Sequence, residues 1–152
     1  MAAGITIQST KIETFRAWLE EKVSLMVSQL RVKKSLNIDG CLSASGANKE
    51  LFEMIEKAGP FGSGNNTPVF VLPSHRLVHL SEVGKGHLRL VISNIEGKKL
   101  QGIAFRAVGT SLGDFLFENI GEIIHLAGNL SLNYWNGTIN PQLRVIDAAA
   151  VI

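Results

Sequence analysis

The chain has 152 residues, of which 45% are hydrophobic and 18% charged, and its formal net charge is +2. This balance excludes an intrinsically disordered chain, because such chains combine low hydrophobicity with high charge. The single Cys41 excludes an internal disulfide, and no apolar run approaches the length of a membrane span. We therefore expect a cytoplasmic protein without a membrane partner.

The first 58 residues have the pattern of helices. Apolar residues recur at spacings of three and four from Ile12 to Leu30, which predicts one long amphipathic helix. A short strand is expected over Leu36–Gly40, and Asn48 is expected to cap a second helix that runs to Lys57. The apolar stripe of the first helix is typical of a packing helix, and if it is left exposed it favours a dimer.

Residues 59–68 end the helical part of the chain. Three glycines, two prolines and two asparagines fall within these ten residues. Neither a helix nor a strand continues through such a run, because proline lacks a donor and glycine and asparagine accept positive φ. We expect a corner between the helical part and a β domain.

From residue 69 the apolar period changes to two, which predicts strands. The expected strands are Val69–Leu80, bent at Pro73, then His87–Ser93, Lys98–Arg106, Ile123–Tyr134 and Thr138–Asp147, with a short helix capped by Ser111 between the third and the fourth. The order β-β-β-α-β-β is that of an OB-fold, a five-stranded Greek-key β-barrel. The predicted fold class is therefore α+β, with an N-terminal helical segment and an OB-fold barrel. A small barrel without the helix, or a half-sandwich, would give a similar strand pattern.

OB-folds bind oligonucleotides on their second and third strands and through the loops between strands one and two and between strands four and five. On the second strand, Leu88, Leu90 and Ile92 are expected to face the core, with His87 and Arg89 outside.

On the third strand, Ile103 and Phe105 are expected inside. Gly102 and Ala104 would then form a low outer floor that ends at Arg106. A flat floor edged by guanidinium groups would let a phosphate backbone approach.

Charge points to the same part of the barrel. Residues 61–110 carry a net charge of +4, whereas residues 111–152 carry −3. The candidate nucleic-acid-binding residues are Lys85, His87, Arg89, Arg106, Asn133, Trp135, Asn136 and Gln142. Trp135 is as typical of a side chain that plugs a barrel as of one that stacks on a base.

Catalytic and metal-binding patterns are not found. His75 and His79 could share a strand face, but no cysteine pair or carboxylate cluster completes a metal site. Gly62-Ser63-Gly64 precedes a strand, whereas a phosphate loop precedes a helix. We expect no catalytic residue, no metal ligand and no cofactor in this chain.

Several stretches, in order, are similar to motifs of the RecJ family, the single-strand-specific 5′→3′ DNA exonucleases. The corner residues Pro60, Phe61, Gly62, Gly64 and Asn65, followed by Pro68-Val69-Phe70, resemble the family's PFGxGN…PVF motif. The other matching stretches are Gly86-His87-Leu88-Arg89-Leu90, Ile103-Ala104-Phe105, Asn133-Tyr134-Trp135-Asn136-Gly137, Gln142-Leu143 and Asp147. Met1-Ala2-Ala3-Gly4 resembles the end of the GGHxxAAG motif of the DHH-associated domain.

The resemblance implies that residues 1–58 are the C-terminal remnant of the DHH-associated domain with connecting helices, that residues 59–68 are a corner, and that residues 69–152 are the OB-fold. It implies a catalytic DHH domain upstream, which would hold manganese or magnesium, and a chain that is inactive alone. The chain departs from the family's pattern where Arg89 replaces a lysine and Gly86 precedes His87.

The expected function is that of the single-stranded DNA-binding C-terminal part of a RecJ-like exonuclease that acts in DNA repair and recombination. The expected partners are single-stranded DNA and proteins of DNA replication or repair. The alternative is an interaction or scaffolding module with little DNA affinity of its own. A third reading is an independent OB domain for tRNA or oligosaccharide.

Overall fold

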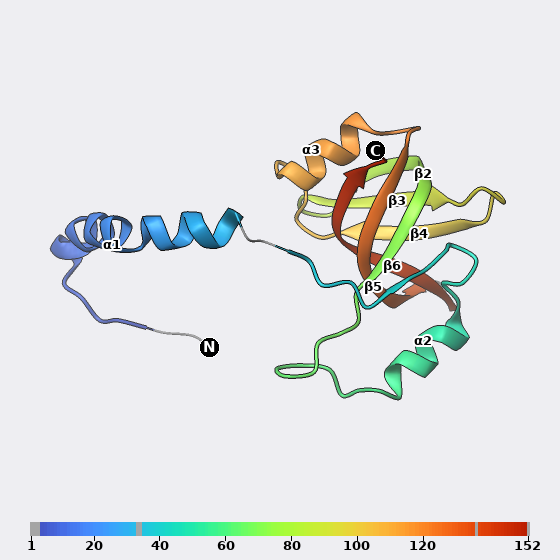
Figure 1. The fold of residues 1–152 in the computed structure, drawn as a ribbon, viewed down its shortest axis with the longest axis horizontal. Coiled ribbons are helices and arrows are strands. Elements are labelled where there is room, and N and C mark those ends of the chain that lie inside the picture. The colour runs from blue at the N-terminus through green and yellow to red at the C-terminus, as the bar shows by residue number, and fades with distance from the viewer. Residues whose placement is uncertain (1–3, 33–34, 136, 152) are drawn as a thin grey trace. The chain divides into compact units, whose positions relative to one another are not determined.

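We describe a computed structural model that covers residues 4–32, 35–135 and 137–151. The elements are a 3-10 turn at Ser9–Lys11, α1 (Ile12–Val32), β1 (Gly40–Cys41), α2 (Lys49–Glu56), β2 (Phe70–Val83), β3 (His87–Ser93), β4 (Lys99–Ala104), α3 (Ser111–Glu118), β5 (Ile123–Trp135) and β6 (Thr138–Ala150) (Figure 1). The chain divides into two compact units, one up to Leu36 and one from Asn37 onward.

The first unit consists of the 3-10 turn and α1. Phe15 and Trp18 stack with their ring centroids 5.9 Å apart, and Glu13 pairs with Arg16 at 3.0 Å. Trp18, Leu25 and Met26 are all more than half exposed. The long helix expected from the apolar spacing is confirmed, and a dimer through its exposed stripe stays a prediction.

The second unit is a closed barrel of five strands. Neighbouring strands follow the order β2-β3-β4-β6-β5, and β2 also pairs with β5 to close the sheet. β4 and β6 pair in parallel, whereas the other pairs among these five strands are antiparallel. With α3 between the third and fourth barrel strands, this is the OB-fold order that the sequence predicts.

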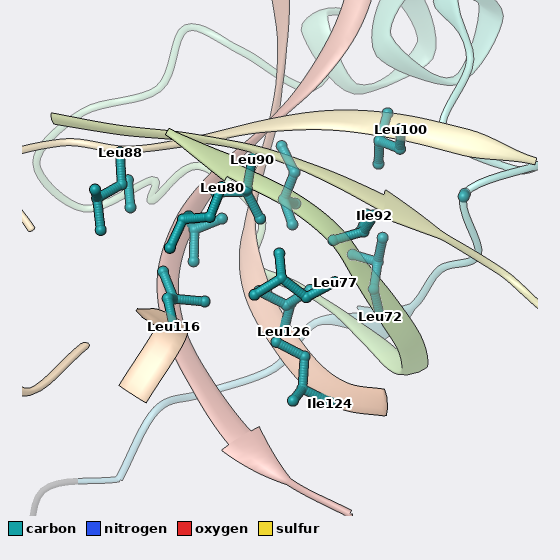
Figure 2. Close-up of a cluster of buried hydrophobic side chains, with 14 of the residues drawn as sticks. Leu72, Leu77, Leu80, Leu88, Leu90, Ile92, Leu100, Leu116, Ile124 and Leu126 are labelled. Atoms are coloured by element: carbon teal, nitrogen blue, oxygen red, sulfur yellow. The ribbon is translucent and has the colours of Figure 1, made fainter. Parts of the chain in front are cut away.

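The barrel core consists of leucines and isoleucines from the inward positions of each strand. Figure 2 shows Leu77, Leu90 and Leu126 from three strands pointing toward one another. Leu88, Leu90 and Ile92 are completely buried, so the expected alternation of β3 is confirmed. Leu116 of α3 is also completely buried in this core. α3 is capped by Thr110, whose hydroxyl accepts from Gly113 N at 3.3 Å, and not by the expected Ser111.

Residues 37–58 pack on the barrel. β1 pairs in parallel with the start of β2, where Gly40 lies opposite Phe70. Ala44 and Ala47 are buried in the barrel core, and Leu51, Phe52 and Ile55 of α2 pack against it. The predicted cap of α2 is present, because Asn48 Oδ1 accepts from Leu51 N at 2.8 Å. Residues 37–58 thus belong to the same compact unit as the barrel, although their helical pattern resembles that of residues 1–36.

β2 bends where the sequence predicts it. The register with β5 shifts between Leu72 and His75, directly around Pro73, and Ser74 adopts a φ of 53°. The bend lets one long strand pair with β5 at its start and with β3 at its end. In the described part of the chain, no helix is both long and apolar enough to cross a membrane.

Candidate nucleic-acid interface

The faces of β4 are the reverse of the prediction. Leu100, Gly102 and Ala104 point into the core, whereas Phe105 is 52% exposed. Gly102 lies opposite Leu90, and a Cβ added to it would lie 2.9 Å from Leu90 Cγ. The expected outer floor of Gly102 and Ala104 is therefore wrong, because the space that Gly102 leaves inside the barrel is filled by Leu90.

Directly opposed residues form one row on the outside of the barrel. Arg89 of β3 lies opposite Ile103 of β4, and Ile103 lies opposite Arg144 of β6. Paired residues on neighbouring strands share a face. Ile103, expected in the core, therefore stands on the outside between two arginines, although it is only 9% exposed. Arg89 is exposed, as its predicted outer position on β3 requires, and Arg144 is exposed as well.

Phe105 is the aromatic centre of this surface. The His87 ring meets it edge-on, with centroids 5.2 Å apart and planes 75° apart. The Arg144 guanidinium carbon lies 5.2 Å from the Phe105 ring centroid, a cation–π contact. We call the surface made by His87, Arg89, Ile103, Phe105 and Arg144 the outer face. Sequence reasoning placed Phe105 in the core and left Arg144 out of the candidate site.

His87 also fixes the end of β4. Its Nδ1 accepts a hydrogen bond from Arg106 N at 2.8 Å. Arg106 has a φ of 52°, which is the left-handed region that only a supported non-glycine residue adopts. The predicted site residues His87, Arg89 and Arg106 are thus brought together around Phe105.

The cations of this region have no acidic partner among the described residues. The ion pairs of the described chain lie on α1 and α2. Lys85, Arg89, Arg106 and Arg144 are exposed and take no part in them. Unpaired exposed cations beside an aromatic ring create a positive potential that favours an anionic ligand.

The remaining candidates lie toward the β5–β6 hairpin. Gln142 lies opposite both Gln101 of β4 and Ser131 of β5, one row beyond the row of Arg89 and Arg144. Asn133 lies opposite Asn140, farther from Phe105 along the hairpin. The backbone of Trp135 ends β5, whereas its side chain and Asn136 lie outside the described residues.

The corner residues contact the protein backbone. Asn65 Nδ2 donates to the carbonyl oxygens of Ala58 at 3.1 Å and Pro60 at 3.0 Å. Gly62 and Asn65 exchange two backbone hydrogen bonds, and Gly64 turns the chain at a φ of 89°. These contacts account for Gly64 and Asn65 of the motif by the geometry of the turn. Phe61 is half-buried.

Asn129 of β5 holds the end of the corner from the barrel side. Its Nδ2 donates to Thr67 O at 3.2 Å and to Pro68 O at 2.8 Å. Asp39 Oδ2 accepts from Val69 N at 2.8 Å on the other side. The corner is therefore built into the fold of the barrel unit.

His75 and His125 have structural partners. His75 is 3% exposed, its Nε2 accepts from Ala44 N at 3.0 Å, and its Nδ1 lies 2.9 Å from Pro73 O. His125 Nδ1 accepts from Ser74 N at 3.0 Å. No group of three or more His, Cys, Asp or Glu able to hold a metal ion occurs among the described residues.

Known proteins agree with this geometry. The model of the RecJ OB domain matches residues 38–147. The single-stranded-DNA-specific exonuclease RecJ of Salmonella typhimurium is 29% identical over 97% of this chain and 25% of its own length, and that of Escherichia coli is 30% identical over 96% and 24%.

A solved structure of RecJ from Thermus thermophilus with Mn²⁺ superposes with a TM-score of 0.61 at 19% identity, over 98% of this chain and 20% of that one. The chain thus spans about a quarter of the length of the curated relatives it matches. The barrel order, the register of β3, β4 and β6 and the match over residues 38–147 together place the chain in the RecJ OB domain family.

Proposed function

We propose that this chain binds single-stranded DNA through the outer face, as the DNA-binding part of a RecJ-type exonuclease. The names of the curated relatives, which are single-stranded-DNA-specific exonucleases, support single-stranded DNA as the ligand. The observation that carries the proposal is the exposed Phe105 ring between His87 and Arg144, directly after β4, beside the strands where OB-folds bind oligonucleotides.

The outer face offers the two contacts that a single strand needs. An exposed aromatic ring stacks on any base, which makes the contact independent of sequence. Arg89, Arg106 and Lys85 are unpaired cations within the described chain and would neutralise phosphates. A base that stacks on Phe105 takes the position of the Arg144 guanidinium over the ring, which frees that group for a phosphate.

The complete protein would be a hydrolase that acts in DNA repair and recombination. Its catalytic domain, with manganese or magnesium, would lie in the part of the relatives that this chain does not match. This chain would hold the DNA strand in the cytoplasm for that domain and would not cleave it alone. Proteins of DNA replication or repair are proposed as further partners.

Fluorescence anisotropy with a labelled oligo-dT of about 15 nucleotides, near the upper end of OB-fold site sizes, tests the proposal. We expect binding that weakens as salt rises from about 50 to about 200 mM. Arg89→Ala and Arg106→Ala should each weaken binding and lower the slope of log K against log salt by about 0.7, as for one lost phosphate contact.

A matched variant is Arg16→Ala, which removes one exposed arginine from α1 and should bind like the wild type. If the wild-type chain does not bind oligo-dT at low salt, the proposal is wrong. If a replication or repair protein binds the chain and oligo-dT does not, the interaction-module alternative replaces it.

A further inference from the structure

A pocket of about 600 Å³ opens beside the outer face, where α2, the β3–β4 hairpin and the start of β6 meet. Val91 and Gln101 line it, and they form the pair next to Arg89 and Ile103. The pocket is therefore continuous with the outer face along β3 and β4. Asn48, Asn140 and Pro141 are among the other lining residues.

Three lysines and no carboxylate line this pocket. They are Lys49 of α2 and Lys98 and Lys99 of the β3–β4 hairpin, and we call it the lysine pocket. Lys98 and Lys99 form no ion pair within the described residues. Lys49 lies 3.5 Å from Glu53 in an exposed i,i+4 pair, which holds a lysine only weakly.

The protein holds these like charges near one another by hydrogen bonds. Asn94 Oδ1 accepts from Lys98 N at 2.9 Å, and Asn94 Nδ2 donates to Ser45 Oγ at 2.7 Å. This links the hairpin to the loop that precedes α2. Glu96, on the same turn, is hydrogen-bonded to Ser45 at 3.0 Å and lines a neighbouring cavity instead.

We propose that the lysine pocket binds a phosphate of the same single strand whose base stacks on Phe105. The inference rests on the proposed function and adds a second anchor to it. Gln101 lies on β4 and Phe105 directly follows the strand, so the two are four residues apart and at most about 13 Å apart at the strand rise. That distance is about four nucleotides at the duplex spacing of 3.4 Å. The single-stranded DNA thus lies along β4, from the lysine pocket to Phe105.

The test uses the wild-type chain and the double variant Lys98→Ala/Lys99→Ala with the labelled oligo-dT. A slope of about −0.7 per phosphate corresponds to about 5-fold per contact at 0.1 M salt. We expect the double variant to bind about 25-fold more weakly and its salt slope to fall by about 1.4. Lys22→Ala/Lys57→Ala removes the same charge from exposed positions outside the pocket and should bind like the wild type.

The outcomes separate this inference from the proposed function. If the wild type does not bind oligo-dT, the proposed function fails. If the wild type binds and the Lys98/Lys99 variant behaves like the Lys22/Lys57 control, only the lysine pocket is wrong. A titration with inorganic phosphate, followed by the amide NMR signals of Lys98 and Lys99, tests whether the pocket binds a free phosphate ion and not a phosphate of the DNA. A shift of those signals together with unchanged oligo-dT binding would make the pocket a small-anion site and overturn the inference.

Discussion

Replacing Phe105 by alanine removes the aromatic surface of the outer face while leaving its charges in place. Stacking of a base on an aromatic side chain contributes about 1–3 kcal/mol. Because about 1.4 kcal/mol changes affinity tenfold, Phe105→Ala should weaken binding of oligo-dT by about 5- to 150-fold. The slope of log K against log salt should stay unchanged, because no phosphate contact is lost.

The same substitution should have a modest effect on folding. Truncation of a fully buried phenylalanine costs about 3–5 kcal/mol, but Phe105 is 52% exposed and leaves no closed cavity. Its cation–π contact with Arg144 contributes about 0.5–1 kcal/mol at an exposed site. We expect a loss of about 1–2 kcal/mol in the free energy of unfolding, measured by urea denaturation.

Phe117→Ala provides the matched control. Phe117 is 45% exposed and lies on α3, outside the strands of the outer face. This variant should lose a similar amount of stability and bind oligo-dT like the wild type. Phe105→Trp should retain binding, because it restores a ring for stacking. Equal affinities of wild type and Phe105→Ala would refute the reasoning, since the stacking site would then not exist.

Two further predictions concern the fold that carries this surface. Gly128→Ala should lower the thermal midpoint strongly, because the added Cβ would lie 2.2 Å from the carbonyl oxygen of Arg144. Gly62→Ala is the control and should be tolerated, because a Cβ added there meets nothing within 4 Å. Equal thermal midpoints of the two variants would contradict the close approach at Gly128. His75→Leu should lower the free energy of unfolding by about 1–3 kcal/mol in urea denaturation, because Ala44 N loses its acceptor in a buried position, and an unchanged midpoint would show that this bond is dispensable.

The core positions of β3 could be predicted because the polar residues His87, Arg89 and Ser93 mark the outer parity, although Val91 also lies on it. The inward face of β4 could not be predicted, because both parities carry apolar or small residues. One parity has Leu100, Gly102 and Ala104, and the other has Ile103 and Phe105. The polar side chain of Gln101 marks its parity as the outer one, and that single signal was outweighed by the size of Phe105.

The N-terminal boundary of the barrel unit could also not be predicted from the sequence pattern. The segment that contains α2 looks like a continuation of the helical region, whereas tertiary contacts join it to the barrel through β1 and the buried Ala44 and Ala47. The lysine pocket depends on the same contacts. Lys49 and Lys98 are far apart in sequence, and the hydrogen bonds of Ser45 with Asn94 and Glu96 join the loop before α2 to the β3–β4 hairpin.

Gly102 has a consequence for the surface on the opposite side of its strand. Leu90 occupies the volume beside its backbone, where a side chain would otherwise stand. If β4 slipped by two residues against β3, Leu90 would meet Leu100 or Ala104, and the interior would be overpacked. The interior therefore locks the alignment that sets Arg89 beside Ile103 and Val91 beside Gln101. A residue with no side chain thus keeps the spacing of the cations outside the barrel constant.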